Sequence, residues 1–205
     1  MIGRKGAWWG VAFVILLFIS AAMVSLPTGT DEGARIAAFY AAHQQLIVWQ
    51  QIVAILAVLP LLAFAASLSA WVRLGGRANR WLLPTAGLVA LASVITSLVP
   101  LAMVLKAMSP DLAHQLTVVE DVADAALFAS LAAFVMAASI GAPFWVRSLA
   151  FLVAIAAVAR AIMSPLGVTA LDAVAPMAVL VFVVLLAARL FFSPSARHQP
   201  AEAVP

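Results

Sequence analysis

The segment Lys106–Asp124 reads KAMSPDLAHQLTVVEDVAD and lies between two long apolar runs of the chain. It contains four of the eight acidic residues and one of the three histidines of the protein. Ser109, Pro110 and Asp111 are typical of a helix start, because serine caps the first turn, proline fits the first helical position and a carboxylate favours the positive helix end. We therefore expect a helix that begins here and continues into the apolar run beyond.

Most polar side chains of this expected helix share one face. An α-helix turns by about 100° per residue, so positions three and four apart lie on the same side. An arc of roughly a third of the circumference contains His114, Thr117, Glu120, Asp121 and Asp124. Carboxylates and an imidazole that enter an apolar segment are costly unless they face protein or water. This face is therefore the candidate site.

Composition decides the class of protein. The 205-residue chain is 66% hydrophobic and 9% charged, whereas a soluble domain is roughly half apolar and about a quarter charged. The mean hydropathy is +1.16. These values predict an all-α integral membrane protein, with the lipid bilayer as its surroundings and a single six-helix transmembrane domain over residues 1–192.

Six apolar runs are long enough to cross a bilayer, at about residues 8–26, 46–70, 81–105, 119–140, 145–163 and 171–190. Between the first two runs, Thr28 or Thr30 can cap a short helix lying at the membrane surface, with Asp31 in its first turn. Asp172, three positions after Thr169, fits a carboxylate at the start of the last helix. The Pro- and Ala-rich residues 193–205 are expected to form a disordered cytoplasmic tail.

The basic residues predict the orientation. Six spans put both termini on one side of the membrane, and that side would hold eight of the eleven Lys and Arg residues: Arg4, Lys5, Arg73, Arg77, Arg80, Arg147, Arg189 and Arg197. The positive-inside rule therefore predicts cytoplasmic N- and C-termini in the plasma (inner) membrane. Membrane topology explains the net charge of +3 better than nucleic-acid binding does, so no nucleic-acid partner is expected.

The outer side collects the candidate ligand or proton-site residues His43, His114, Glu120, Asp121, Asp124 and Arg160. A structural interpretation starts from Arg160, which lies near the outer end of the fifth run and needs an anionic neighbour or water. The candidate partners are Asp121, Asp124 and Asp172. Such an ion pair would hold two helices together.

Metal and proton chemistry are the alternatives for the same residues. His43, His114 and Asp121 could supply two imidazoles and a carboxylate to a transition metal, although their spacing matches no named metal motif. Closely spaced carboxylates could instead share protons. Haem would need both histidines inside the bundle, whereas both lie near its edge, and the absence of cysteine excludes thiolate metal sites in this chain. We therefore expect no cofactor.

Three functions follow from these features. The leading one is non-enzymatic: a helical accessory subunit, or a protein that binds a small ligand, a membrane-protein partner or a second copy of itself through the outer polar cluster. The alternative is a proton- or ion-coupled transporter that uses Glu120, Asp121 and Asp124. The third is a membrane enzyme acting on a lipid-like substrate, with His43 or His114 as general base. The sequence contains no glycine-rich phosphate loop and no GxSxG nucleophile motif.

The passage from residue 36 to 68 reads IAAFYAAHQQLIVWQQIVAILAVLPLLAFAASL. Together with the basic loop after it, this passage resembles the opening of a group of uncharacterised six-helix bacterial integral membrane proteins. The resemblance covers about residues 27–80 and rests on a short extracellular segment, a long second helix and a basic inner loop, carried here by Phe39, Tyr40, His43, Arg73 and Arg77. It implies a six-helix architecture in a bacterial plasma membrane and no particular activity.

Overall fold

The computed structural model describes residues 2–74, 79–105, 108–168 and 170–192. Over these residues the fold is all-α, without strands. Six helices are long and apolar enough to cross a membrane, as predicted: α1 (Ile2–Met23), α3 (Gln44–Leu74), α4 (Leu82–Leu105), α5 (Pro110–Ser139), α6 (Phe144–Met163) and α7 (Val174–Phe192). The remaining elements are the short helix α2 (Gly33–Ala42) and a 3-10 turn at Ser164–Leu166.

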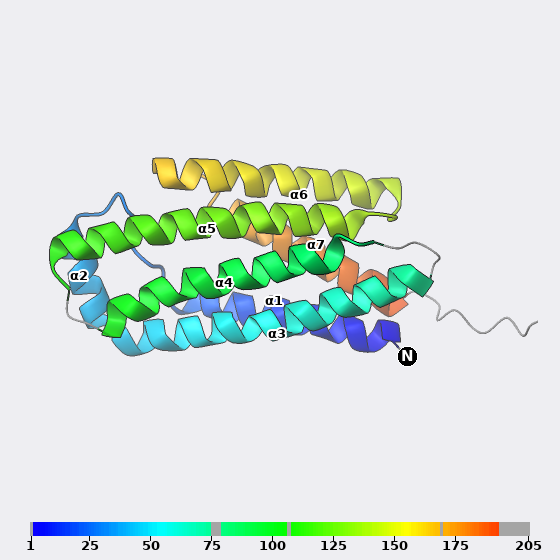
Figure 1. The fold of residues 1–205 in the computed structure, drawn as a ribbon, viewed down its shortest axis with the longest axis horizontal. Helices are drawn as coiled ribbons and strands as arrows, with labels where there is room; N and C mark the ends of the chain where they lie inside the picture. Colours follow the sequence, from blue (N-terminus) through cyan, green and yellow to red (C-terminus); the bar gives the residue numbers. More distant parts are fainter. Residues whose placement is uncertain (1, 75–78, 106–107, 169, 193–205) are drawn as a thin grey trace, which may run out of the picture.

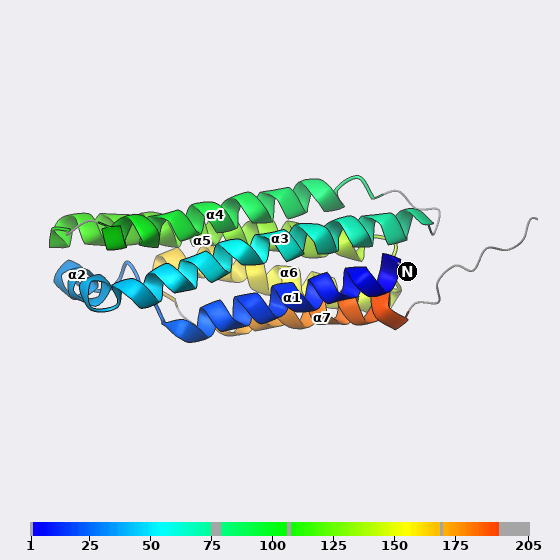
Figure 2. The same cartoon turned by 90° about the horizontal axis from the view of Figure 1, so that it is seen from below.

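The six long helices lie along one common direction, each antiparallel to the next long helix in the chain (Figures 1 and 2). Each packs on its neighbour in this order, and α7 packs on α1, so the helices form a closed ring. The short helix α2 lies at one end of the bundle and packs mainly on α5. We call this the cap end. The start of α1 and the end of α7 lie at the opposite end, which we call the terminal end (Figure 1).

The start of α5 confirms the predicted cap. The Ser109 hydroxyl accepts a hydrogen bond from the backbone N–H of Leu112 at 3.4 Å, and Pro110 and Asp111 occupy the first turn. The helix thus begins before the apolar run expected at 119–140. It can do so because the backbone hydrogen bonds of a helix do not depend on the polarity of its side chains.

The starts of α2 and α7 differ from the predictions. Residue Glu32 occupies the N-cap of α2 without a capping hydrogen bond from its side chain. Neither threonine caps the helix, because Asp31 closes the preceding turn by accepting the backbone N–H of Thr28 at 3.0 Å. The first turn of α7 contains no acidic residue, and Asp172 faces Arg160 instead.

Several predictions fall on residues outside the described ranges. They concern Arg77, Thr169, Arg197 and the tail at 193–205.

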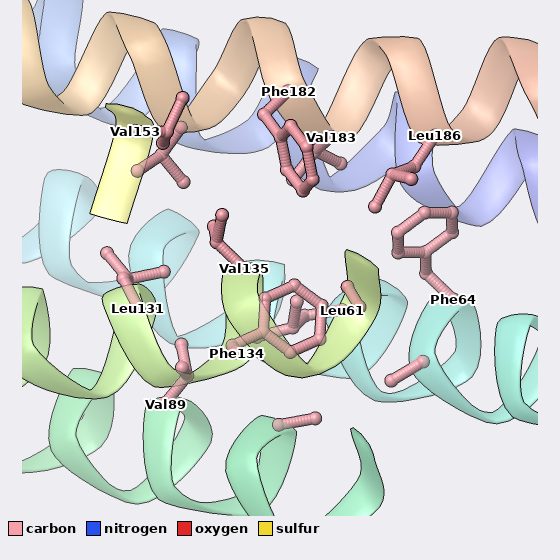
Figure 3. Close-up of a cluster of buried hydrophobic side chains, with 14 of the residues drawn as sticks. Leu61, Phe64, Val89, Leu131, Phe134, Val135, Val153, Phe182, Val183 and Leu186 are labelled. Atoms are coloured by element: carbon pink, nitrogen blue, oxygen red, sulfur yellow. The ribbon is translucent and has the colours of Figure 1, made fainter. Parts of the chain in front are cut away.

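Two apolar clusters stabilise the bundle. The larger one fills the space enclosed by the long helices, where Phe134 and Val135 of α5 face Leu61 of α3 and Phe182 of α7 (Figure 3). The smaller one lies beneath α2 and consists of Ile36, Tyr40, Ile47, Met103 and Ala113. This second cluster positions α2 over the first turns of α5.

Glycines let α1 approach α3 closely. A Cβ atom at Gly6 would lie 2.5 Å from the Cβ of Ser67, and one at Gly10 would lie 2.9 Å from the ring of Phe64. The two glycines are four residues apart and therefore lie on the same face of α1. Small residues at this spacing are typical of closely packed helices in membranes.

The outward faces of the long helices are apolar. Leu59 on α3 is 65% exposed, Leu91 on α4 is 59% exposed and Leu152 on α6 is 63% exposed. A water-soluble protein of this size rarely exposes apolar side chains over so much of its surface. Such an outer surface is typical of helices that face lipid.

Candidate functional site

Glu120, the first of three carboxylates on α5, binds the cap helix. The hydroxyl of Tyr40 on α2 donates a hydrogen bond to Oε2 of Glu120 at 3.1 Å, and the two side chains are 2% and 9% exposed. Burial, and next the neighbouring Glu120 carboxylate, raise the pKa of the Tyr40 hydroxyl. The hydroxyl therefore keeps its proton and acts as the donor that ties α2 to α5.

Asp121, the second carboxylate, binds the loop between α1 and α2. The backbone N–H of Gly29 donates a hydrogen bond to Oδ2 of Asp121 at 2.9 Å. A Cβ atom at Gly29 would lie 2.7 Å from that oxygen and 3.2 Å from Val118. Only glycine allows this close approach without a shift of the loop or of the carboxylate.

Asp124, the third carboxylate, binds α6. Its Oδ2 accepts a hydrogen bond from Nη1 of Arg160, so the ion pair expected from the sequence is present. Nε of Arg160 lies 3.4 Å from Oδ1 of Asp172, but these two atoms do not reach hydrogen-bond geometry. The guanidinium also lies over the ring of Phe128, 3.8 Å from its centroid. Arg160 thus joins α5, α6 and the turn before α7.

The two candidate histidines lie apart from the carboxylate contacts. Nδ1 of His43 lies 2.9 Å from the backbone oxygen of Phe39, and its ring stacks on that of Phe39 with the centroids 4.4 Å apart. His114 is exposed and lines an open recess of about 360 Å³ together with Gly33, Pro110, Asp111 and Gln115.

The structure therefore does not bring His43, His114 and Asp121 together. Among the residues it describes, no group of three or more His, Asp or Glu side chains could hold a metal ion. A second recess, of about 20 Å³, lies at the terminal end beside Trp71 and Gly141. Neither of these two recesses is lined by Glu120, Asp121 or Asp124.

Three participants in the site were not among the residues singled out for it: Gly29, Tyr40 and Phe128. Phe128 lies four residues after Asp124 on α5, so helical spacing could have placed both beside one arginine. Tyr40 is the one tyrosine of the chain, and a buried tyrosine hydroxyl usually finds a hydrogen-bond partner. No comparable signal points to Gly29, because its contribution is a backbone N–H.

No protein-family model, curated protein or solved structure matches the chain. The resemblance of residues 27–80 to a group of bacterial membrane proteins therefore stays a prediction.

Proposed function

We propose that the chain is a non-enzymatic, multi-pass protein of the plasma (inner) membrane with cytoplasmic termini, which serves as a helical accessory subunit and binds a partner or small ligand at its cap end. One observation carries this proposal: Glu120, Asp121 and Asp124 are bound by three different segments of the chain. Carboxylates arranged in this way fix α2 and the loop before it against the long helices. The cap end can therefore present a surface of fixed shape to a partner or ligand.

The chemistry of the cap end fits recognition better than catalysis. The recess beside His114 is open, and its wall combines an imidazole, a carboxylate from Asp111 and an amide from Gln115. Arg35 is 76% exposed on the same end, where Asp31 accepts its hydrogen bond at 2.9 Å. The cap end therefore offers hydrogen-bond donors and acceptors, and groups of positive and negative charge, to a polar ligand or to the surface of a partner.

The orientation can be tested directly, because the chain contains no cysteine. Single substitutions Ala38→Cys on α2 and Ala201→Cys near the C-terminus give two unique labelling sites. In intact bacterial cells, a membrane-impermeant maleimide should label the first and spare the second until the membrane is opened. The reverse pattern would contradict cytoplasmic termini, and labelling of both in intact cells would contradict insertion with six spans.

The structural role of the carboxylates separates this proposal from transport. Glu120→Gln, Asp121→Asn and Asp124→Asn should each lower the thermal stability of the purified protein, because each weakens a tie between segments. Glu32→Gln is the matched control, because Glu32 is exposed at the same end.

In vesicles loaded with a pH-sensitive dye, the wild-type chain should not dissipate an imposed pH or sodium gradient.

The alternative is a proton- or ion-coupled carrier, and Glu120 is the observation that favours it. This carboxyl group is 9% exposed within a largely apolar helix, where intramembrane carboxyl groups often relay protons. A carrier predicts gradient-driven flux that Glu120→Gln abolishes while thermal stability is retained. That pair of results would replace the proposal.

The accessory role has its own test. Extracts of source membranes in mild detergent should contain the chain in an assembly larger than the purified chain forms in the same detergent. Elution at the same size in both preparations would contradict a stable partner.

A further inference from the structure

The terminal end concentrates positive charge. Six of the eight Lys and Arg residues in the described part of the chain lie there, contributed by four helices and the turn before α4: Arg4, Lys5, Arg73, Arg80, Arg147 and Arg189. All seven acidic residues in the same part of the chain lie toward the cap end. The two halves of the bundle therefore carry opposite charge, although each helix is mostly apolar.

Tryptophan follows the same distribution. Five of the six tryptophans lie at the terminal end, and three of them are more than half exposed: Trp8, Trp81 and Trp145, at 65%, 55% and 56%. Trp49 alone lies toward the cap end, at the start of α3. Exposed indole rings beside apolar helix faces are typical of the depth at which lipid headgroups begin.

Aromatic rings lie beside three of the cations. The guanidinium of Arg80 lies 5.2 Å from the ring centroid of Trp81, and that of Arg4 lies 5.2 Å from the centroid of Phe191. Arg189 lies 5.7 Å from the centroid of Trp71. An aromatic ring beside a guanidinium favours its positive charge, and a guanidinium such as that of Arg4 or Arg80 can donate two N–H groups to one phosphate.

We propose that the terminal end binds the headgroups of anionic phospholipids in preference to zwitterionic ones. A ligand for this surface has to present phosphate charge directly beside hydrocarbon, because the cations surround the ends of helices whose outer faces are apolar. A phospholipid has both parts, whereas a nucleic acid or an acidic peptide lacks the hydrocarbon. This inference rests on the proposed insertion into a membrane and adds the class of lipid.

The tryptophans supply the assay. Full-length Trp49→Phe protein, in which all remaining tryptophans lie at the terminal end, is reconstituted into phosphatidylcholine vesicles that contain either brominated phosphatidylglycerol or brominated phosphatidylcholine at the same mole fraction. Bromine quenches nearby indoles, so the ratio of the two quenching efficiencies measures the lipid preference. The double variant Arg4→Gln, Arg80→Gln tests whether the basic residues of the terminal end produce this preference. Arg35→Gln, which removes an exposed cation toward the cap end, is the matched control.

Stronger quenching by brominated phosphatidylglycerol supports the proposal if three further results accompany it. The preference should weaken by about fivefold for each cation removed, and it should fall at high salt. It should also survive Arg35→Gln. Equal quenching by the two lipids, or a preference unchanged in the double variant, overturns it. If inorganic phosphate abolishes the preference and chloride of equal ionic strength does not, the patch binds free phosphate instead. If brominated phosphatidylcholine causes no quenching and the protein does not float with the vesicles, the proposed membrane insertion has failed as well.

Discussion

Arg160 shows how a single cation organises the cap end. Its guanidinium contacts Asp124 and Asp172 and lies over Phe128, and its side chain is only 13% exposed. A charged group in such surroundings depends strongly on its partners, because solvent contributes little to its stabilisation. The arrangement predicts that the loss of one anionic partner weakens the contact between α5 and α6.

Asp124→Asn should lower the free energy of unfolding by about 1–3 kcal/mol, because the ion pair is lost and the charged guanidinium of Arg160 keeps only a neutral acceptor at this position. Thermal or denaturant unfolding in detergent measures the change. Glu32→Gln, at an exposed carboxylate, should change the stability by less than about 0.5 kcal/mol. Equal effects of the two substitutions would show that the Arg160 contact contributes nothing specific.

Tyr40 allows a direct optical titration, because it is the chain's single tyrosine. Burial, followed by the Glu120 carboxylate, raises the pKa of its hydroxyl above the ordinary value of 10.0. The folded state is therefore favoured below pH 10, and this contribution is lost as the pH rises through the higher pKa of the folded protein. Phenolate absorbance should appear at higher pH in the native protein than in the unfolded chain. Coincident titration curves would contradict the buried contact.

Helical spacing predicted part of the site. It placed Glu120, Asp121 and Asp124 near one another. The sequence also offered Asp121, Asp124 and Asp172 as partners of Arg160, and the structure pairs Arg160 with Asp124 and Asp172, whereas Asp121 binds Gly29. It could not predict that Asp121 contacts a backbone N–H 92 residues away, or that Glu120 contacts a hydroxyl 80 residues away. Those contacts depend on how the α1–α2 loop folds back over α5.

At the scale of the helices, the close contact between α1 and α3 requires glycine. Gly10→Ala should destabilise the protein, because its new Cβ would lie 2.9 Å from Phe64 and 3.1 Å from Ala187. Gly87→Ala on α4 is the matched control, since nothing lies within 4 Å of a Cβ there. That substitution should be neutral, or stabilising by up to about 1 kcal/mol through helix propensity. Equal unfolding temperatures for the two variants would mean that α1 can move away from α3 without cost.

The six long helices could be predicted from apolar length alone, and the start of α5 from its serine and proline. The start of α2 could not, because two threonines and two acidic residues compete for the same turn. Asp31 uses its carboxylate to close that turn and to bind Arg35. Local propensity allowed several caps, whereas in the structure Glu32 occupies the N-cap position without a capping hydrogen bond from its side chain.

For the whole molecule, the ring of helices and the distribution of charge have different origins. Apolar packing brings α7 and α1 together and closes the ring. The described acidic residues gather toward the cap end, where Glu120 binds α2, Asp121 binds the loop before it and Asp124 binds α6. Most of the described basic residues gather at the terminal end. The sequence could predict this separation of charge, because successive long helices run in opposite directions and successive loops therefore lie at opposite ends of the bundle. It could not predict that the acidic cluster is bound by three different segments.

The most direct test of the account is hydrogen–deuterium exchange of α2 in the Glu120→Gln, Asp121→Asn double variant. If these carboxylates hold the cap, peptides covering residues 33–42 should exchange about tenfold faster or more than in wild type. Peptides from the core of α3 should keep their protection, and Glu32→Gln should leave both regions unchanged. Unaltered protection of α2 in the double variant would contradict a structural role for the acidic cluster.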